Sequence, residues 1–168
     1  MSIIRQCRSD EYPTILTIIN TAAERYRGAI PPDCWHEPYM DAQQLARDID
    51  GGVSFWGYED DDGQLAGIMG VQRGKGVTLI RHAYVCPERQ GKGIGGLLLR
   101  HLEMLTTDAR VLIGTWADAA WAIRFYEGHG YSLMPLEETP ALLNAYWDIP
   151  TRQVETSVVL TKATRRPT

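Results

Sequence analysis

Apolar residues recur at spacings of three and four in three parts of the chain, which is the period of a helix with one buried face. These parts cover residues 12–26, 93–107 and 121–129. Ser9 and Asp10 are good N-cap types for the first of them. Asp41 can cap a further helix to about residue 48, ended by Gly51-Gly52. A short helix is also expected around Pro140, within residues 137–147.

Short stretches rich in β-branched residues, or alternating apolar and polar ones, predict strands. They cover residues 3–7, 53–59, 64–72, 77–85, 111–116, 131–134 and 154–161. Asp60-Asp61-Asp62-Gly63 supplies the turn of a hairpin. Three prolines between residues 28 and 40 exclude a helix interior, so we expect an aromatic loop there. The order of elements predicts an α/β or α+β layered fold with a mixed sheet.

Length and composition favour one globular domain. The chain has 168 residues, 44% hydrophobic and 23% charged, without a Ser/Gly-rich linker or an internal repeat. We therefore treat residues 1–168 as a single domain.

The charge balance argues against nucleic acid as a partner. Lys and Arg number 17 against 21 Asp and Glu, which gives a net charge of −4. The one local basic cluster is the Arg165-Arg166 tail. No apolar run reaches the ~18 to 20 residues that span a bilayer, and charges interrupt the first dozen residues, so we expect neither a membrane span nor a secretion signal. A cytoplasmic protein is the resulting expectation.

The cysteines predict neither disulfides nor a metal centre. Cys7, Cys34 and Cys86 are odd in number and widely spaced, and no CxxC or histidine pair accompanies them. We expect reduced thiols and no bound metal.

A glycine-rich segment joins the strand that ends at Val85 to the apolar-faced helix that begins near Gly93. Such a turn leaves backbone N–H groups facing outward, and the helix N-terminus adds partial positive charge. Glycine lets the backbone approach phosphate oxygens closely, and Lys92 can add a charge. A polyphosphate is the ligand that this arrangement favours.

Two other interpretations of the same glycines stay open. Gly91, Gly93 and Gly96 satisfy G-x-G-x-x-G, with Asp118 further along the chain, as in dinucleotide-binding domains. A charged segment separates strand from loop here, whereas the dinucleotide loop follows its strand immediately. The second alternative is a glycine-rich turn that binds no ligand.

Two ordered motifs resemble the GNAT family of N-acetyltransferases. Gln90, Gly93 and Gly95 match the family's Q/R-x-x-G-x-G/A motif, within a wider V-x-P-x-x-Q-G-x-G-x-G pattern that begins at Val85. The second family motif, A-x-x-F-Y-x-x-x-G-Y/F, is matched downstream by Ala122, Phe125, Tyr126, Gly130 and Tyr131. The resemblance implies a mixed, mostly antiparallel sheet of about seven strands with helices on both faces.

The resemblance also implies acetyl-CoA as co-substrate. In the family, loop amides hold its pyrophosphate and the preceding strand binds its pantetheine arm through the backbone. The positions implied for pantetheine are Tyr84 and Val85, and those implied for pyrophosphate are Gln90, Gly91, Lys92, Gly93, Ile94 and Gly95.

Acetyl transfer by direct attack needs a neutral amine and a proton for the departing thiolate. Tyr126 stands where the family places its general acid. The family's frequent strand glutamate is absent, since residues 77–85 contain no carboxylate, and His82 is the one group there that titrates near neutral pH. His82 is therefore the candidate base. Arg81 either binds an acidic acceptor group or is ion-paired.

The aromatic loop is the candidate acceptor region, since in this family the acceptor usually sits between the first helices and the strand ends. His36, Glu37 and Tyr39 can hold an ammonium by charge and cation–π contact, and Trp116 either lines the cleft or packs in the core. A small amine or a peptide N-terminus fits this chemistry. The C-terminal strand offers an edge that can pair across a homodimer. A catalytically silent acyl-CoA-binding module and, more distantly, a dinucleotide-binding reductase are the alternative functions.

Overall fold

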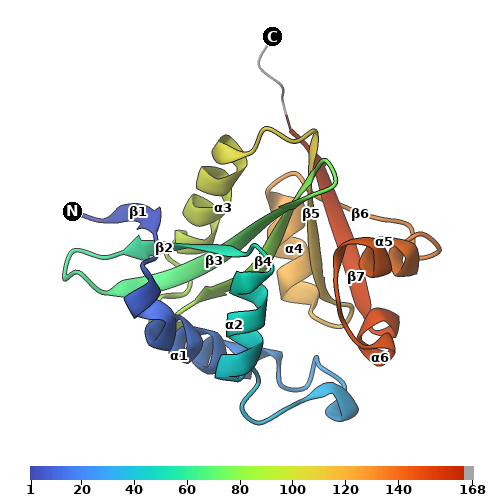
Figure 1. Ribbon diagram of the computed structural model, residues 1–168, viewed down its shortest axis with the longest axis horizontal. Helices are drawn as coiled ribbons and strands as arrows, with labels where there is room; N and C mark the ends of the chain where they lie inside the picture. Colours follow the sequence, from blue (N-terminus) through green and yellow to red (C-terminus); the bar gives the residue numbers. More distant parts are fainter. Residues whose placement is uncertain (165–168) are drawn as a thin grey trace. The chain divides into compact units, whose positions relative to one another are not determined.

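The computed structural model describes residues 1–164, so the Arg165-Arg166 tail lies outside the described residues. Figure 1 shows the elements in chain order. The strands are β1 (Ile3–Gln6), β2 (Ser54–Glu59), β3 (Leu65–Gly74), β4 (Val77–Val85), β5 (Arg110–Trp116), β6 (Ser132–Leu133) and β7 (Ser157–Ala163). The helices are α1 (Tyr12–Ala22), α2 (Ala42–Asp50), α3 (Ile94–Leu105), α4 (Ala120–Gly128), α5 (Thr139–Tyr146) and α6 (Thr151–Glu155).

The described strands form a seven-stranded sheet in the order β1-β2-β3-β4-β5-β7-β6. The pairs β1–β2, β2–β3, β5–β7 and β6–β7 are antiparallel. A mostly antiparallel sheet of seven strands with helices was expected, and this fold class is confirmed. Short 3-10 turns occupy residues 9–11, 23–26, 32–34 and 87–89.

The chain divides into two compact units. Among the described residues, the first holds residues 1–25, 36–73 and 80–106, and the second holds residues 26–35, 74–79 and 107–164. Strand β4 contributes its last six residues to the first unit and its first three to the second. Each unit has its own apolar core.

In the first unit, helices cover both faces of β2 and β3. Ile68 of β3 is fully buried in a core with residues of α1 and α2, among them Ile15, Ile19 and Leu45. A Cβ added at the neighbouring Gly67 would instead meet Ile94 and Leu98 of α3, at 3.0 and 3.4 Å. Because successive strand residues point to opposite faces, α1 and α2 lie on one face and α3 on the other (Figure 1).

In the second unit, α5 and α6 pack against β5 and β7. Leu143 of α5 and Val154 of α6 share a buried cluster with Leu112 and Val159. The Trp147 ring, just after α5, lies 3.3 Å from where a Cβ on Gly114 would stand, so glycine permits this close packing.

The C-terminal strand prediction was wrong at its start. Residues 151–155 form α6, and β7 begins at Ser157. Val154 fits the strand alternation but is buried as a helical residue, and Val158, Val159 and Leu160 are buried consecutively because the strand is covered on both faces.

The expected dimer edge was also wrong, because β7 is an inner strand paired with β5 and β6. The predicted strand 131–134 is reduced to the two residues of β6. Among the described residues, no helix is both long enough and apolar enough to cross a membrane.

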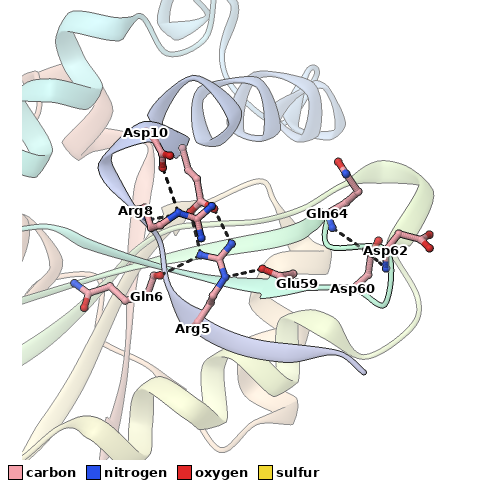
Figure 2. Close-up of polar contacts among 9 residues, drawn as sticks. Arg5, Gln6, Arg8, Asp10, Glu59, Asp60, Asp62 and Gln64 are labelled. Atoms are coloured by element: carbon pink, nitrogen blue, oxygen red, sulfur yellow. Dashed lines mark hydrogen bonds and ion pairs between the residues drawn. The ribbon is translucent and has the colours of Figure 1, made fainter.

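A partly buried ion-pair network fixes β1 to the start of α1 (Figure 2). Arg5 donates to both oxygens of Glu11 at 2.6 and 3.1 Å and to Glu59 of β2 at 2.7 Å. Glu11 also accepts the Arg8 backbone N–H at 2.8 Å. Ser9 and Asp10 do not cap α1 as expected, because they lie in a 3-10 turn before the helix. Glu11 stands at the N-cap of α1, and its side chain makes no capping hydrogen bond to that helix.

We predict that Glu11→Gln lowers the free energy of unfolding at pH 7 by about 1–3 kcal/mol, the range for hydrogen bonds to charged groups. The hydrogen bonds from Arg5 lower the pKa of Glu11 from 4.5 to about 2. A carboxyl group whose pKa is lower in the folded state than in the unfolded state stabilises the fold at any pH above its unfolded-state pKa. For Glu11 this stabilisation is lost as the pH falls from about 4.5 to 2. Urea unfolding of the native protein and of Glu11→Gln, measured from pH 7 to pH 3, should therefore show that the difference in their unfolding free energies narrows as the pH falls.

Asp10→Asn is the matched control, because the Asp10 side chain is 76% exposed and bonds Arg8 at 3.3 Å. Its unfolding free energy should stay within about 0.5 kcal/mol of the native value. A stability gap for Glu11→Gln that is constant across the pH range would contradict the assigned role of the carboxylate.

Candidate active site

The segment between β4 and α3 forms an open, glycine-shaped loop in the first unit. Gly91 and Gly93 both have φ of +81°, a left-handed conformation that glycine adopts without the strain of a Cβ. A Cβ built at either position meets no protein atom within 4 Å. The space beside the two glycines is therefore open, and a ligand can approach the loop backbone closely.

The first turn of α3 presents unpaired backbone donors. The first backbone hydrogen bond from α3 back to the preceding loop is donated by the Leu97 N–H to the Gly93 carbonyl, at 3.1 Å. Within residues 1–164, no protein acceptor takes a hydrogen bond from the N–H groups of residues 91–96. These donors and the positive end of the helix dipole make a cradle for an anion.

Side-chain contacts hold the loop to its surroundings. Arg89, in the 3-10 turn at the start of the loop, donates to Asp60 in the β2–β3 turn. Asp60 in turn accepts the N–H groups of Asp62 and Gln64, at 2.9 and 3.0 Å (Figure 2). The Gln90 side chain donates to the Val85 carbonyl at 3.2 Å, which ties the loop to the strand end. Arg25 donates to the Gln90 side-chain oxygen at 3.4 Å.

The cofactor residues predicted from sequence thus lie on one continuous segment of the first unit. Tyr84 and Val85 are half-buried at the end of β4, and residues 91–93 are exposed, Lys92 among them. The Gln90 N–H bonds the Pro87 carbonyl at 3.4 Å, so the free amides begin at Gly91.

Strand β4 carries a local distortion at the candidate base. His82 has φ of +56°, which is uncommon for a residue other than glycine and costs of order 1–3 kcal/mol. The partner strand accommodates it through Gly70, where a Cβ would lie only 2.8 Å from the Arg81 carbonyl oxygen. The distortion thus involves both strands, the positive φ of His82 on β4 and the absence of a side chain at Gly70 on β3.

The His82 ring is held by a carboxylate from α2. Its Nε2 lies 2.8 Å from an Asp48 oxygen, and Phe55 stacks on it with ring centroids 5.9 Å apart. Gln44 donates to the other Asp48 oxygen at 3.0 Å, and Arg81 lies 3.8 Å from that oxygen.

Burial and the Arg81 charge lower the pKa of His82, against the raising effect of Asp48. Burial raises the pKa of Asp48, but the hydrogen bond from His82 and the Arg81 charge outweigh it and the pKa falls below its ordinary value. At neutral pH the pair is therefore a neutral imidazole beside a carboxylate.

Sequence reasoning missed Asp48. It searched for a carboxylate on β4 itself, whereas this one comes from 34 residues earlier in the chain. The available signal was its place in the helix, three residues after the buried Leu45 and hence on the same apolar face.

In the second unit, Tyr126 of α4 is 7% exposed and packs against Phe125 and Tyr131, with ring centroids 5.1 and 6.0 Å away. Burial, with a smaller contribution from Tyr26, raises its pKa, so the phenol stays protonated at neutral pH. The Tyr126 hydroxyl has no hydrogen bond within residues 1–164. Trp116, at the end of β5, is 6% exposed.

Of the predicted acceptor residues, His36, Glu37 and Tyr39 lie in the first unit and Trp116 lies in the second. His36 and Glu37 are exposed, and Tyr39 packs against that unit's core. The loop is fixed where it ends, because the Asn20 side chain bonds both the N–H and the carbonyl of Met40, at 2.7 and 2.8 Å.

Comparisons with known proteins relate part of the sequence to one family and the fold to solved structures. Residues 51–133 match a family described as "Acetyltransferase (GNAT) domain". A comparison with curated protein sequences finds no significant match.

Solved structures resemble the chain over nearly its whole length. A GNAT-family acetyltransferase from Staphylococcus aureus Mu50 is 13% identical, with a TM-score of 0.73, over 98% of this chain and all of that one. The PaiA N-acetyltransferase from Thermoplasma acidophilum, in complex with coenzyme A, is 16% identical, with a TM-score of 0.73, over 97% and 99% of the two chains.

A spermidine N-acetyltransferase from Vibrio cholerae, in complex with coenzyme A and spermine, is 14% identical, with a TM-score of 0.67, over 97% and 95% of the two chains. The fold is therefore shared across the whole chain, and the sequence signature covers the segment that holds the glycine loop. Residues 51–133 thus match a GNAT acetyltransferase domain, in a chain whose whole fold is that of GNAT acetyltransferases.

Proposed function

We propose that the chain, acting as one domain over residues 1–168 in the cytoplasm, transfers an acetyl group from acetyl-CoA to a primary amine of a small molecule. The observation that carries the proposal is the loop after β4, with two left-handed glycines and unpaired amides at the start of α3. A CoA pyrophosphate fits such a cradle, because each phosphate oxygen accepts backbone N–H bonds.

The donor would lie along one segment of the chain. The amides of residues 91–95 would hold the pyrophosphate, with Lys92 adding charge and Gln90 bracing the loop against Val85. The backbone of Tyr84 and Val85 would bind the pantetheine arm. The coenzyme A complexes of the similar archaeal and Vibrio structures support this assignment.

The chemistry we propose is direct attack. The amine lone pair forms the new C–N bond at the thioester carbonyl, and the C–S bond breaks with its electron pair on sulfur. Tyr126 gives its proton to the thiolate, and His82 accepts the proton that the amine loses. The raised pKa of Tyr126 keeps it a donor, and the lowered pKa of His82 keeps it an acceptor.

The loop residues His36, Glu37 and Tyr39 are the candidates to hold the acceptor in the first unit, and Trp116 is the candidate in the second. Exposed Glu37 offers charge to an ammonium, and the aromatic rings offer cation–π contact. The spermine complex of the similar Vibrio enzyme supports a small amine as the substrate class. A peptide N-terminus has the same reacting group and belongs in the test.

We predict that Gly93→Ala weakens CoA binding about tenfold or more in calorimetry, because the added Cβ occupies the space of the ligand. Gly63→Ala, in the β2–β3 turn, is the matched control, since Gly63 also has positive φ, +77°, and open space around its Cβ. Both variants should lose about 1 kcal/mol of stability from backbone strain.

Equal CoA affinity in the two glycine variants would contradict the placement of the pyrophosphate. NADH binding in place of CoA binding would favour the dinucleotide alternative.

We predict that Tyr126→Phe lowers amine-dependent thiol release from acetyl-CoA about 10²-fold or more, the lower end of general-acid contributions. Its thermal stability should change little, because the hydroxyl has no hydrogen bond within the described chain. The assay compares amino acids, polyamines, aminoglycosides and peptide N-termini as acceptors.

Turnover by Tyr126→Phe equal to that of the native protein would exclude Tyr126 as the acid. Tight acetyl-CoA binding without turnover for any acceptor would favour the silent binding module.

A further inference from the structure

The Asp48 carboxylate fixes which nitrogen of His82 carries the proton. The Asp48 oxygen lies 2.8 Å from Nε2, and a carboxylate can only accept. Nε2 must therefore be the protonated nitrogen. The remaining nitrogen, Nδ1, then carries the lone pair.

Nδ1 is reachable from outside the protein. The His82 side chain is 15% exposed, and within residues 1–164 no protein group bonds Nδ1. No fully buried side-chain nitrogen or oxygen of the described residues lacks a hydrogen-bond partner, so Nδ1 is in contact with solvent. The buried nitrogen holds the ring in place and the accessible nitrogen is basic.

The surroundings leave the ring little freedom to turn over. Phe55 stacks on one face, with planes 22° apart, and the left-handed backbone of His82 sets the side-chain direction. Asp48 is itself braced by Gln44 from the preceding turn of α2. The charged groups that face the imidazole are Asp48 from α2 and Arg81 from β4.

We propose that Asp48 is a positioning residue, which holds His82 as the Nε2–H tautomer so that Nδ1 accepts the proton of the attacking amine. This inference rests on the proposed function and names the group that activates its base. Strand β4 carries no carboxylate, and α2 supplies one instead. This carboxylate is hydrogen-bonded to the candidate base and does not act as the base itself.

The tautomer is tested without any substrate. Nitrogen-15 spectra of the native protein should show His82 protonated at Nε2 and unprotonated at Nδ1 at pH 7.5. In Asp48→Asn the side-chain amide can donate to Nε2, which favours the Nδ1–H tautomer, and the pKa of His82 should fall because the raising effect of the carboxylate is lost. A native Nδ1–H tautomer overturns the inference even if Asp48→Asn fails to fold.

The catalytic consequence is tested with the acceptor found in the turnover assay. In Asp48→Asn, kcat should fall about 10²-fold or more, with KM for acetyl-CoA within twofold of native. The residual activity should lose the acidic limb of the native pH profile, which follows deprotonation of His82. Asp50→Asn is the matched control, because Asp50 is an exposed residue of the same helix, and its kinetics should stay native.

A double substitution separates positioning from mere packing. His82→Asn removes the imidazole while keeping a residue that tolerates positive φ. If Asp48 acts through His82, Asp48→Asn should cost no further activity in the His82→Asn background. Losses that multiply, or an Asp48→Asn variant within threefold of native kcat, overturn the inference. Turnover that depends on Tyr126 but on neither Asp48 nor His82 overturns the inference about Asp48 and leaves the proposed acetyl transfer standing. The absence of turnover with any amine overturns both the inference and the proposed function.

Discussion

One left-handed residue in an otherwise extended strand determines the geometry of the candidate site. At His82 the backbone of β4 leaves the β region, and Gly70 on the neighbouring strand makes room for it. The distortion aims the imidazole at Asp48 and leaves Nδ1 accessible. Three residues later the strand ends at Val85 and the chain enters the glycine loop. The end of strand β4 therefore sets the separation between the candidate base, His82, and the anion-binding loop.

Burial acts in opposite directions on the two candidate proton-transfer groups. It lowers the pKa of His82, a base that becomes charged when protonated, and raises that of Tyr126, an acid that becomes charged when deprotonated. Both groups are therefore neutral at pH 7, with the base able to accept and the acid able to donate. A proton acceptor and a proton donor of this kind are what the proposed direct attack on a thioester uses.

The sequence predicted the fold and the loop well, for physical reasons that can be named. Helices with a single buried face, such as α3, show their period directly, and the glycines of the loop are required by positive φ at Gly91 and Gly93. The C-terminal segment failed because Val154, the buried residue of α6, continues the apolar alternation that leads into β7, so it satisfied a strand pattern while lying in a helix.

The Asp48–His82 pair could not be predicted by spacing, because tertiary packing joins residues 34 positions apart. A buried carboxylate on an apolar helix face was the one clue, and it names no partner. The sequence also held no sign that His82 adopts positive φ, since that conformation depends on the glycine opposite. Site residues set by local chain geometry were therefore accessible to prediction, and those set by contacts between elements were not.

The proposed binding of the CoA phosphates by the unpaired loop amides can be tested without turnover, by a backbone amide NMR titration with CoA that is repeated with inorganic pyrophosphate. The amides of residues 91–96 should shift most with both ligands, while those of residues 61–63 stay unchanged. Unmoved loop amides at saturating CoA, or the largest shifts outside the loop and the end of β4, would contradict the proposed binding.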